Sequence, residues 1–127
     1  MKHPYAFTLL LGIVLLFGAG CQSNKETLLM GDFFTGNLLS YKNGKMEIIA
    51  SGFRGADAIE QDGDMLYVSS WPLGKVWSFN LVTQEKRELK GDFTTAADFY
   101  LDRADKQLVV PDMLESKIHF LKLNDDG

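Results

Sequence analysis

Two aspartates in matching short motifs are the first residues in this chain that could do chemistry. Asp57 lies in a Gly-Ala-Asp-Ala-Ile motif that starts at Gly55, and Asp98 lies in an Ala-Ala-Asp-Phe motif that starts at Ala96. Carboxylate oxygens are the ligands that hard divalent cations prefer. The same pattern also fits a structural role, in which each carboxylate accepts backbone N–H bonds in a loop that enters a strand. Both readings are open at this stage.

Three polar residues stand at the ends of similar apolar runs: Asp32, Ser70 and Asp112. They can line the mouth of a site, or they can simply terminate strands. Trp71 and Met113 follow two of them and can either floor a ligand pocket or pack between sheets, as aromatic and thioether side chains often do. We take Ser70, Trp71, Asp112 and Met113 as predicted ligand-binding residues.

Composition excludes several classes of protein. The chain has 127 residues with 46% apolar and 24% charged residues, a net charge of −4, one cysteine and two histidines. These values are typical of a small globular domain and not of a disordered chain. A sequence pI near 5.1 argues against a nucleic-acid partner. One cysteine cannot form an internal disulfide, and one cysteine with two histidines is too few for a Cys/His zinc site.

The N-terminus has the pattern of a targeting segment. Lys2 precedes an almost wholly apolar run over 5–17, and the small residues 18–20 lead into Cys21. This run is shorter than the roughly 20 residues of a membrane span. The pattern resembles a bacterial lipoprotein signal, which implies a signal peptide over 1–20, a lipid on Cys21, a tether over 21–27 and a domain over 28–127. The resemblance places the protein in the bacterial cell envelope, with the membrane as a partner; ordinary secretion is the alternative.

Ten short β-type runs follow, separated by turn residues such as Asn43-Gly44 and Asp62-Gly63. Such dipeptides tolerate positive φ and suit tight hairpins, so we expect an all-β fold with antiparallel strands paired in chain order. The predicted strands are 28–30, 37–41, 45–50, 57–61, 65–69, 75–80, 86–90, 98–101, 107–110 and 117–123.

The runs repeat along the chain. The Gly-Asn-Leu-Leu-Ser-Tyr segment at Gly36 matches Gly-Lys-Val-Trp-Ser-Phe at Gly74 and Ser-Lys-Ile-His-Phe-Leu at Ser116, at shifts of 38 and 42 residues. A period near 40 with four strands is typical of a propeller blade. Only the middle copy has all four strands, so the sequence predicts a partial propeller of two to three blades. We expect either a fragment of a longer propeller or several copies that assemble a ring through blade edges.

The Gly55 motif, the Asp-Gly-Asp-Met-Leu-Tyr-Val-Ser-Ser-Trp segment at 62–71 and the Gly-Lys-Val-Trp-Ser-Phe-Asn segment at 74–80 together resemble the gluconolactonase and senescence-marker-protein family of six-bladed propellers, and more loosely the NHL-repeat propellers. That resemblance implies a divalent metal at the axis, most often calcium. It carries a metal-ligand role and a catalytic-base role onto Asp57, with Asp98 as its repeat mate and second candidate ligand. The family's remaining ligands lie in blades that this chain lacks.

Two functions are therefore predicted. The first is an envelope lipoprotein that belongs to, or assembles into, a propeller that binds a small-molecule ligand. The alternative is a metal-dependent hydrolase of lactones or sugar esters with Asp57 as ligand and base.

Overall fold

The computed structural model describes residues 26–123 of the chain. These residues form ten strands and no helix, so no helix in the described range could cross a membrane. The strands are β1 (Leu28–Gly31), β2 (Leu38–Lys42), β3 (Lys45–Ala50), β4 (Ala56–Asp62), β5 (Met65–Ser70), β6 (Lys75–Asn80), β7 (Lys86–Lys90), β8 (Tyr100–Asp102), β9 (Gln107–Asp112) and β10 (Lys117–Lys122).

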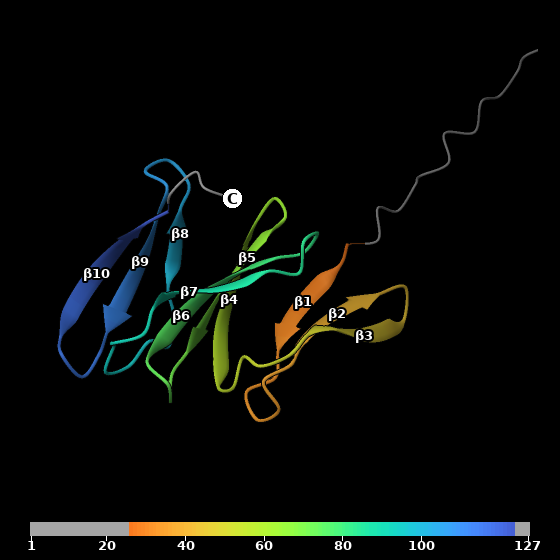
Figure 1. Cartoon of the computed structure of the whole chain (residues 1–127), viewed down its shortest axis with the longest axis horizontal. Coiled ribbons are helices and arrows are strands. Elements are labelled where there is room, and N and C mark those ends of the chain that lie inside the picture. The colour runs from red at the N-terminus through yellow and green to blue at the C-terminus, as the bar shows by residue number, and fades with distance from the viewer. Residues whose placement is uncertain (1–25, 124–127) are drawn as a thin grey trace, which may run out of the picture.

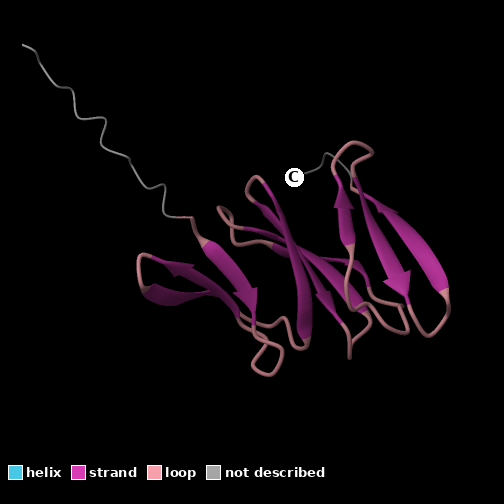
Figure 2. Cartoon of the chain, turned by 180° about the vertical axis from the view of Figure 1, so that it is seen from behind, coloured by secondary structure: helices cyan, strands magenta, loops and turns pink. Residues whose placement is uncertain are grey.

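The strands form three antiparallel sheets, in the orders β1-β2-β3, β4-β5-β6-β7 and β10-β9-β8. We call these sheets blade 1, blade 2 and blade 3. They follow one another across the molecule with blade 2 in the middle (Figures 1 and 2). The all-β prediction is confirmed, as is the prediction that only the middle copy has four strands. The described residues form partial propeller-like blades and no closed ring.

Local turn chemistry sets the hairpins. Asn43 and Gly44 both adopt positive φ, at 54° and 80°, which is the backbone that a two-residue turn between β2 and β3 requires. Gly63 adopts a φ of 56° between β4 and β5. These turns fix the register of the strands that they join.

Two predicted strand boundaries are wrong by two residues. The run 107–110 was expected to end before Pro111, but β9 continues to Asp112. The run 98–101 was expected to form a strand, but β8 covers only Tyr100–Asp102. The Oδ1 atom of Asp98 accepts a hydrogen bond from the backbone N of Phe99 at 2.8 Å. Because this bond engages a backbone donor locally, Asp98 lies in the segment before β8 and outside the sheet.

Blade 2 is buried on both faces because each face packs against a neighbouring blade. The first interblade core, between blades 1 and 2, consists of Leu38, Phe53, Ala56, Leu66, Val68, Trp77 and Phe79. The second interblade core, between blades 2 and 3, consists of Tyr67, Val76, Phe93, Ala96, Phe99, Leu101, Leu108 and Val110. Trp77 and Phe79 share one strand face, and both rings meet Phe53 edge to face at centroid distances of 5.5 and 5.8 Å.

Candidate functional site

Three repeat-equivalent loops lie at one end of the molecule. They cover residues 32–37 between β1 and β2, 71–74 between β5 and β6, and 113–116 between β9 and β10. Figure 1 shows all three along the lower side of the molecule. We call them the rim loops. The residues predicted to bind a ligand lie in these loops or directly before them.

Asp32, Ser70 and Asp112 hold the rim loops in the same way. In each loop the side-chain oxygen accepts a hydrogen bond from the backbone N–H three residues later. The acceptors and donors are Asp32 and Thr35 (3.2 Å), Ser70 and Leu73 (3.3 Å), and Asp112 and Glu115 (3.3 Å). This is the local capping that favours Asp and Ser at the start of turns. All three residues therefore have a shared structural role.

Ser70 and Asp112 also bind the segment that precedes the first strand of their own blade, β4 in blade 2 and β8 in blade 3. The Ser70 hydroxyl donates to the backbone oxygen of Arg54 at 2.7 Å. The Asp112 carboxylate accepts bonds from Thr94 N at 2.6 Å and from the Thr95 hydroxyl at 3.1 Å. Both residues are buried. Of the predicted ligand-binding residues, these two lie beneath the surface that a ligand would touch.

The hydrogen bonds keep the Asp112 carboxylate ionised. Burial by itself would raise the pKa of Asp112, but the donors of Thr94, Glu115 and Thr95 together lower that pKa below its usual value. The pKa of Asp32 is also lowered, chiefly by the Thr35 hydroxyl. Both carboxylates therefore act as acceptors for the loops rather than as proton donors.

The other two predicted ligand-binding residues, Trp71 and Met113, are exposed and belong to neither interblade core. Large apolar side chains at Phe34, Leu73 and Leu114 are exposed in the same three loops. The sequence reasoning missed these three. The sequence could have pointed to them, because each is a large apolar residue in a turn segment, where polar residues are usual.

Asp57 and Asp98, the two candidate metal ligands, are both exposed. Asp57 is an exposed residue in β4, where the register with β5 shifts between Ala56 and Ile59. Asp98 is exposed in the segment before β8. Among residues 26–123, neither belongs to a set of three or more carboxylate, histidine or cysteine ligands close enough to hold a metal. Calcium takes six to eight oxygen ligands, so these two residues alone do not fit the metal that the family resemblance implies.

A different group could hold a metal ion: Asp112, Glu115 and His119, whose ligand atoms lie within 4.8 Å of one another. The β9–β10 hairpin brings them together. Asp112 in β9 pairs with Lys117 in β10. His119 lies two residues after Lys117 in β10, so its side chain is on the same face of the sheet as those of Lys117 and Asp112. The sequence pattern did not point to this group, although the three residues lie within or beside one predicted hairpin.

Most ligand atoms of this group already have protein partners, and Nε2 of His119 is the exception. Glu115 accepts hydrogen bonds from the Thr94 hydroxyl at 3.1 Å and from Lys117 Nζ at 3.0 Å. Lys90 Nζ lies 3.5 Å from Nδ1 of His119. The Nε2 atom of His119 is buried without a partner, the one such side-chain atom found among the described residues. With one imidazole and two carboxylates, the donor set suits zinc or another transition ion better than calcium.

Repeat equivalence gives His119 a packing role as well. His119 occupies the position that Trp77 has in blade 2, and its ring meets Phe93 edge to face at 5.1 Å, as Trp77 meets Phe53. A lysine covers the phenylalanine in each case: Lys86 over Phe53 at 4.2 Å and Lys90 over Phe93 at 4.9 Å. His119 therefore replaces an aromatic core residue.

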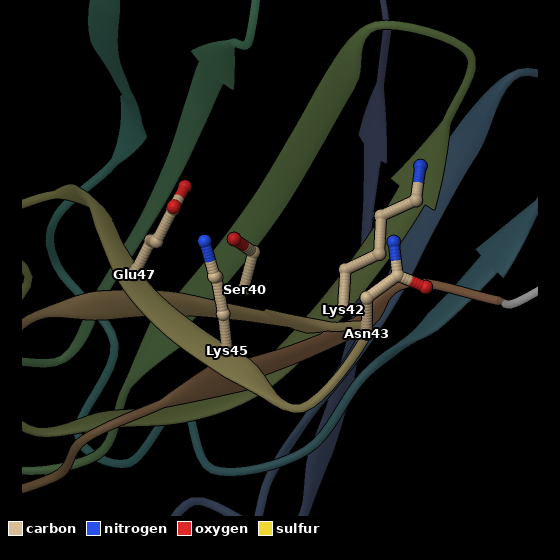
Figure 3. A pocket seen from close by; sticks show the side chains of 5 residues that line it. All are labelled: Ser40, Lys42, Asn43, Lys45 and Glu47. Atoms are coloured by element: carbon tan, nitrogen blue, oxygen red, sulfur yellow. The ribbon is translucent and has the colours of Figure 1, made fainter.

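Two hollows lie away from the rim loops. One, of about 290 Å³, sits on the β2–β3 hairpin and is lined by Ser40, Lys42, Asn43, Lys45 and Glu47 (Figure 3). A larger one, of about 570 Å³, is lined by residues of β5, β6 and β7 on one side and by Phe120–Leu123 on the other. It lies beside β10, the edge strand of blade 3, which has no counterpart of β7 among the described residues.

A search for protein families finds no model that matches this chain, and no curated protein matches it. The resemblance to gluconolactonase-type propellers thus stays a prediction. The signal run and Cys21 lie outside the described residues.

Proposed function

We propose that this protein is an envelope-tethered binding module built from gluconolactonase-like propeller blades, and that the rim loops are its binding surface. The observation that carries this proposal is the common construction of the three loops. In each loop, Asp32, Ser70 or Asp112 accepts a hydrogen bond from the loop backbone, and large apolar side chains of the loop are exposed. Loops held by a rigid sheet scaffold are where binding residues concentrate.

The exposed side chains define the chemistry of the ligand. Trp71, Met113 and Leu114 offer apolar surface and an indole ring, on which the apolar face of a sugar or another amphipathic small molecule can stack. No arginine or lysine lies within the three rim loops. A neutral or amphipathic ligand fits this surface better than a phosphorylated one.

The hydrolase alternative has less support. It needs Asp57 to hold a metal and to act on water, yet the exposed Asp57 stands outside the group of possible metal ligands. The buried carboxylate of Asp112 is engaged by the loop that it caps. We therefore favour binding without turnover.

The binding surface can be tested through tryptophan fluorescence. The chain has two tryptophans, of which Trp71 is 49% exposed and Trp77 is 5% exposed. Titration of the full chain with glucono-lactone and with octyl glucoside, two probes with an apolar sugar face, should change the emission of Trp71. The Trp71→Phe variant should lose the response, whereas Trp77→Phe should keep it.

Turnover is measured on the same samples as lactone hydrolysis, with and without millimolar calcium or zinc. We expect no hydrolysis above the uncatalysed rate. Hydrolysis that disappears in Asp57→Ala but persists in Trp71→Phe would refute the binding proposal in favour of the hydrolase.

The tether rests on the sequence of residues 1–21 and is tested separately. Membrane fractions of cells that express the chain should contain it, and Cys21→Ser should release it into the soluble fraction. Labelling with a radioactive fatty acid should be lost in the same variant. Unchanged membrane retention of Cys21→Ser would argue against a lipid on this residue.

A further inference from the structure

The two end blades carry exposed apolar faces whose repeat equivalents are buried inside the same molecule. We call the face of each blade toward the preceding blade its leading face, and the opposite face its trailing face. The leading face of blade 2 consists of Leu66, Val68, Trp77 and Phe79, and it packs on blade 1. The trailing face of blade 2 includes Tyr67, Ser69, Val76 and Ser78, and it packs on blade 3.

The leading face of blade 1 has no neighbour among the described residues. A shift of 38 residues maps the leading face of blade 2 onto Leu28, Met30, Leu39 and Tyr41, which the strand register places on one face together with Met46 and Ile48. Leu28 is 57% exposed, whereas its equivalent Leu66 is fully buried. Six apolar side chains and no charge therefore form this face.

The trailing face of blade 3 is uncovered in the same way. A shift of 42 residues maps the trailing face of blade 2 onto Val109, Pro111, Ile118 and Phe120, and Tyr100 pairs with Val109 on the same face. Ile118 is 62% exposed, whereas its equivalent Val76 is fully buried. Contiguous apolar surface of this kind marks an interaction site.

The side chains of the two end faces compensate each other in size. Phe120 stands where blades 1 and 2 have Ser40 and Ser78 on their trailing faces. Leu39 stands where blade 2 has Trp77 on its leading face. A bulkier trailing face on blade 3 thus matches a less bulky leading face on blade 1. The two interblade contacts inside the chain provide the template for this third one.

We infer that a second copy of this chain covers these faces: the leading face of blade 1 in one copy packs on the trailing face of blade 3 in the other. Such a head-to-tail contact uses two different surfaces and closes when the rotation completes a ring. Two copies supply six blades, within the range of four to eight that propellers have. The inference does not depend on which ligand the rim loops take.

The test is the mass of the full chain in a mild detergent, by sedimentation and light scattering. We expect a particle with twice the protein mass of one chain. Ile48→Asp on the leading face and Phe120→Asp on the trailing face alter residues of equal exposure, 61% each, and both should give monomers with unchanged circular dichroism. Val82→Asp is the matched control, because Val82 is 71% exposed in the β6–β7 turn, away from both faces, and it should stay dimeric.

Mixing the two variants makes the test specific. Each retains one intact face, so an equimolar mixture of Ile48→Asp and Phe120→Asp should regain a dimer through one contact, although neither variant dimerises alone. A dimer that only one of the two substitutions breaks would mean that a face meets itself, which overturns the head-to-tail arrangement. A monomeric parent chain, or an open series of larger particles, would overturn the closed pair. If Phe120→Asp fails to fold, Ile118→Asp tests the same face.

Discussion

The two interblade cores share a backbone plan and differ in the side chains that fill it. In each, a phenylalanine in the loop that enters a blade donates its N–H to the carbonyl of a glycine in the previous blade: Phe53 to Gly36 at 2.9 Å and Phe93 to Gly74 at 3.2 Å. Phe53 then meets the two rings of Trp77 and Phe79. Phe93 meets the single ring of His119.

This difference shows how a repeat can keep its geometry while one copy becomes polar. In the second core, His119 replaces a tryptophan and brings a buried Nε2 without a partner. The buried carboxylate of Asp112 lies nearby and accepts three hydrogen bonds, from Thr94, Thr95 and Glu115. A buried polar atom that lacks a partner costs free energy. We therefore expect equivalent substitutions in the two cores to change the free energy of unfolding by different amounts.

Removal of the phenylalanine ring should have the largest effect. Phe53→Ala should lower the free energy of unfolding by about 3–5 kcal/mol, because a fully buried ring is lost and a cavity remains. Phe93→Ala should cost less, since Phe93 has one ring partner instead of two. Urea denaturation of both variants measures the difference, with Phe53→Leu as the substitute if Phe53→Ala does not fold. An equal or larger loss in Phe93→Ala would contradict the comparison.

Substitution of the glycines whose carbonyls accept the hydrogen bonds of these phenylalanines should have the next largest effect on stability. Gly74 has a φ of 57°, and a Cβ added there would lie 1.9 Å from the carbonyl oxygen of Phe93. Gly74→Ala should therefore cost more than about 2 kcal/mol, because the left-handed backbone alone costs about 1–2 kcal/mol. Ser116 has the equivalent place in blade 3 with a φ of 51° and is exposed.

The matched change Ser116→Gly should shift stability by less than about 1 kcal/mol, in the stabilising direction, since it relieves the positive φ without touching a neighbour. Thermal melts of both variants give the comparison. A small effect in Gly74→Ala would mean that the loop carrying Phe93 can move away from blade 2.

Substitution of the histidine should change stability by about 1 kcal/mol. His119→Phe keeps an aromatic ring against Phe93 and removes the unpartnered nitrogen, so we expect stabilisation of roughly this size. Trp77→Phe in the first core removes apolar volume and should destabilise. Loss of stability in His119→Phe would instead indicate that His119 has a partner such as a bound metal, and added zinc should then raise the melting temperature of the parent chain.

The smallest effect concerns pH. The pKa of Asp112 is lowered in the folded protein, because hydrogen bonds to the carboxylate outweigh its burial. The ionised form therefore contributes stability above the unfolded pKa of about 3.9, and that contribution is lost as pH falls through the folded pKa. Melting temperatures between pH 6 and pH 3 should fall by a few degrees more in the parent chain than in Asp112→Asn.

Asp112→Asn should also be less stable than the parent at pH 6, since its amide nitrogen would face backbone donors. Asp32→Asn is the control from blade 1, whose more open loop should give a weaker change. A parent curve that parallels that of Asp112→Asn would contradict the role given to this carboxylate.

Local sequence was sufficient for the strands and the repeat. Alternating side chains and dipeptides such as Asn43-Gly44 act over a few residues, so all ten strands and the incomplete first and third blades could be predicted. The start of β8 and the end of β9 were the exceptions, and Asp98 shows why. Its carboxylate bonds to the adjacent Phe99 N–H, a choice between local bonding and the sheet that residue types alone do not decide.

Burial and convergence were decided only by the tertiary structure. Ser70 and Asp112 looked like residues of an open mouth, yet contacts with Arg54 and Thr94, 16 and 18 residues away, bury them as supports of the rim loops. Trp71 has the aromatic side chain of a typical core residue, yet no blade within residues 26–123 covers it. Sequence thus determined which segments become strands, since that depends on neighbours in the chain. Which side chains face a ligand, a core or a second copy depends on how the blades stack.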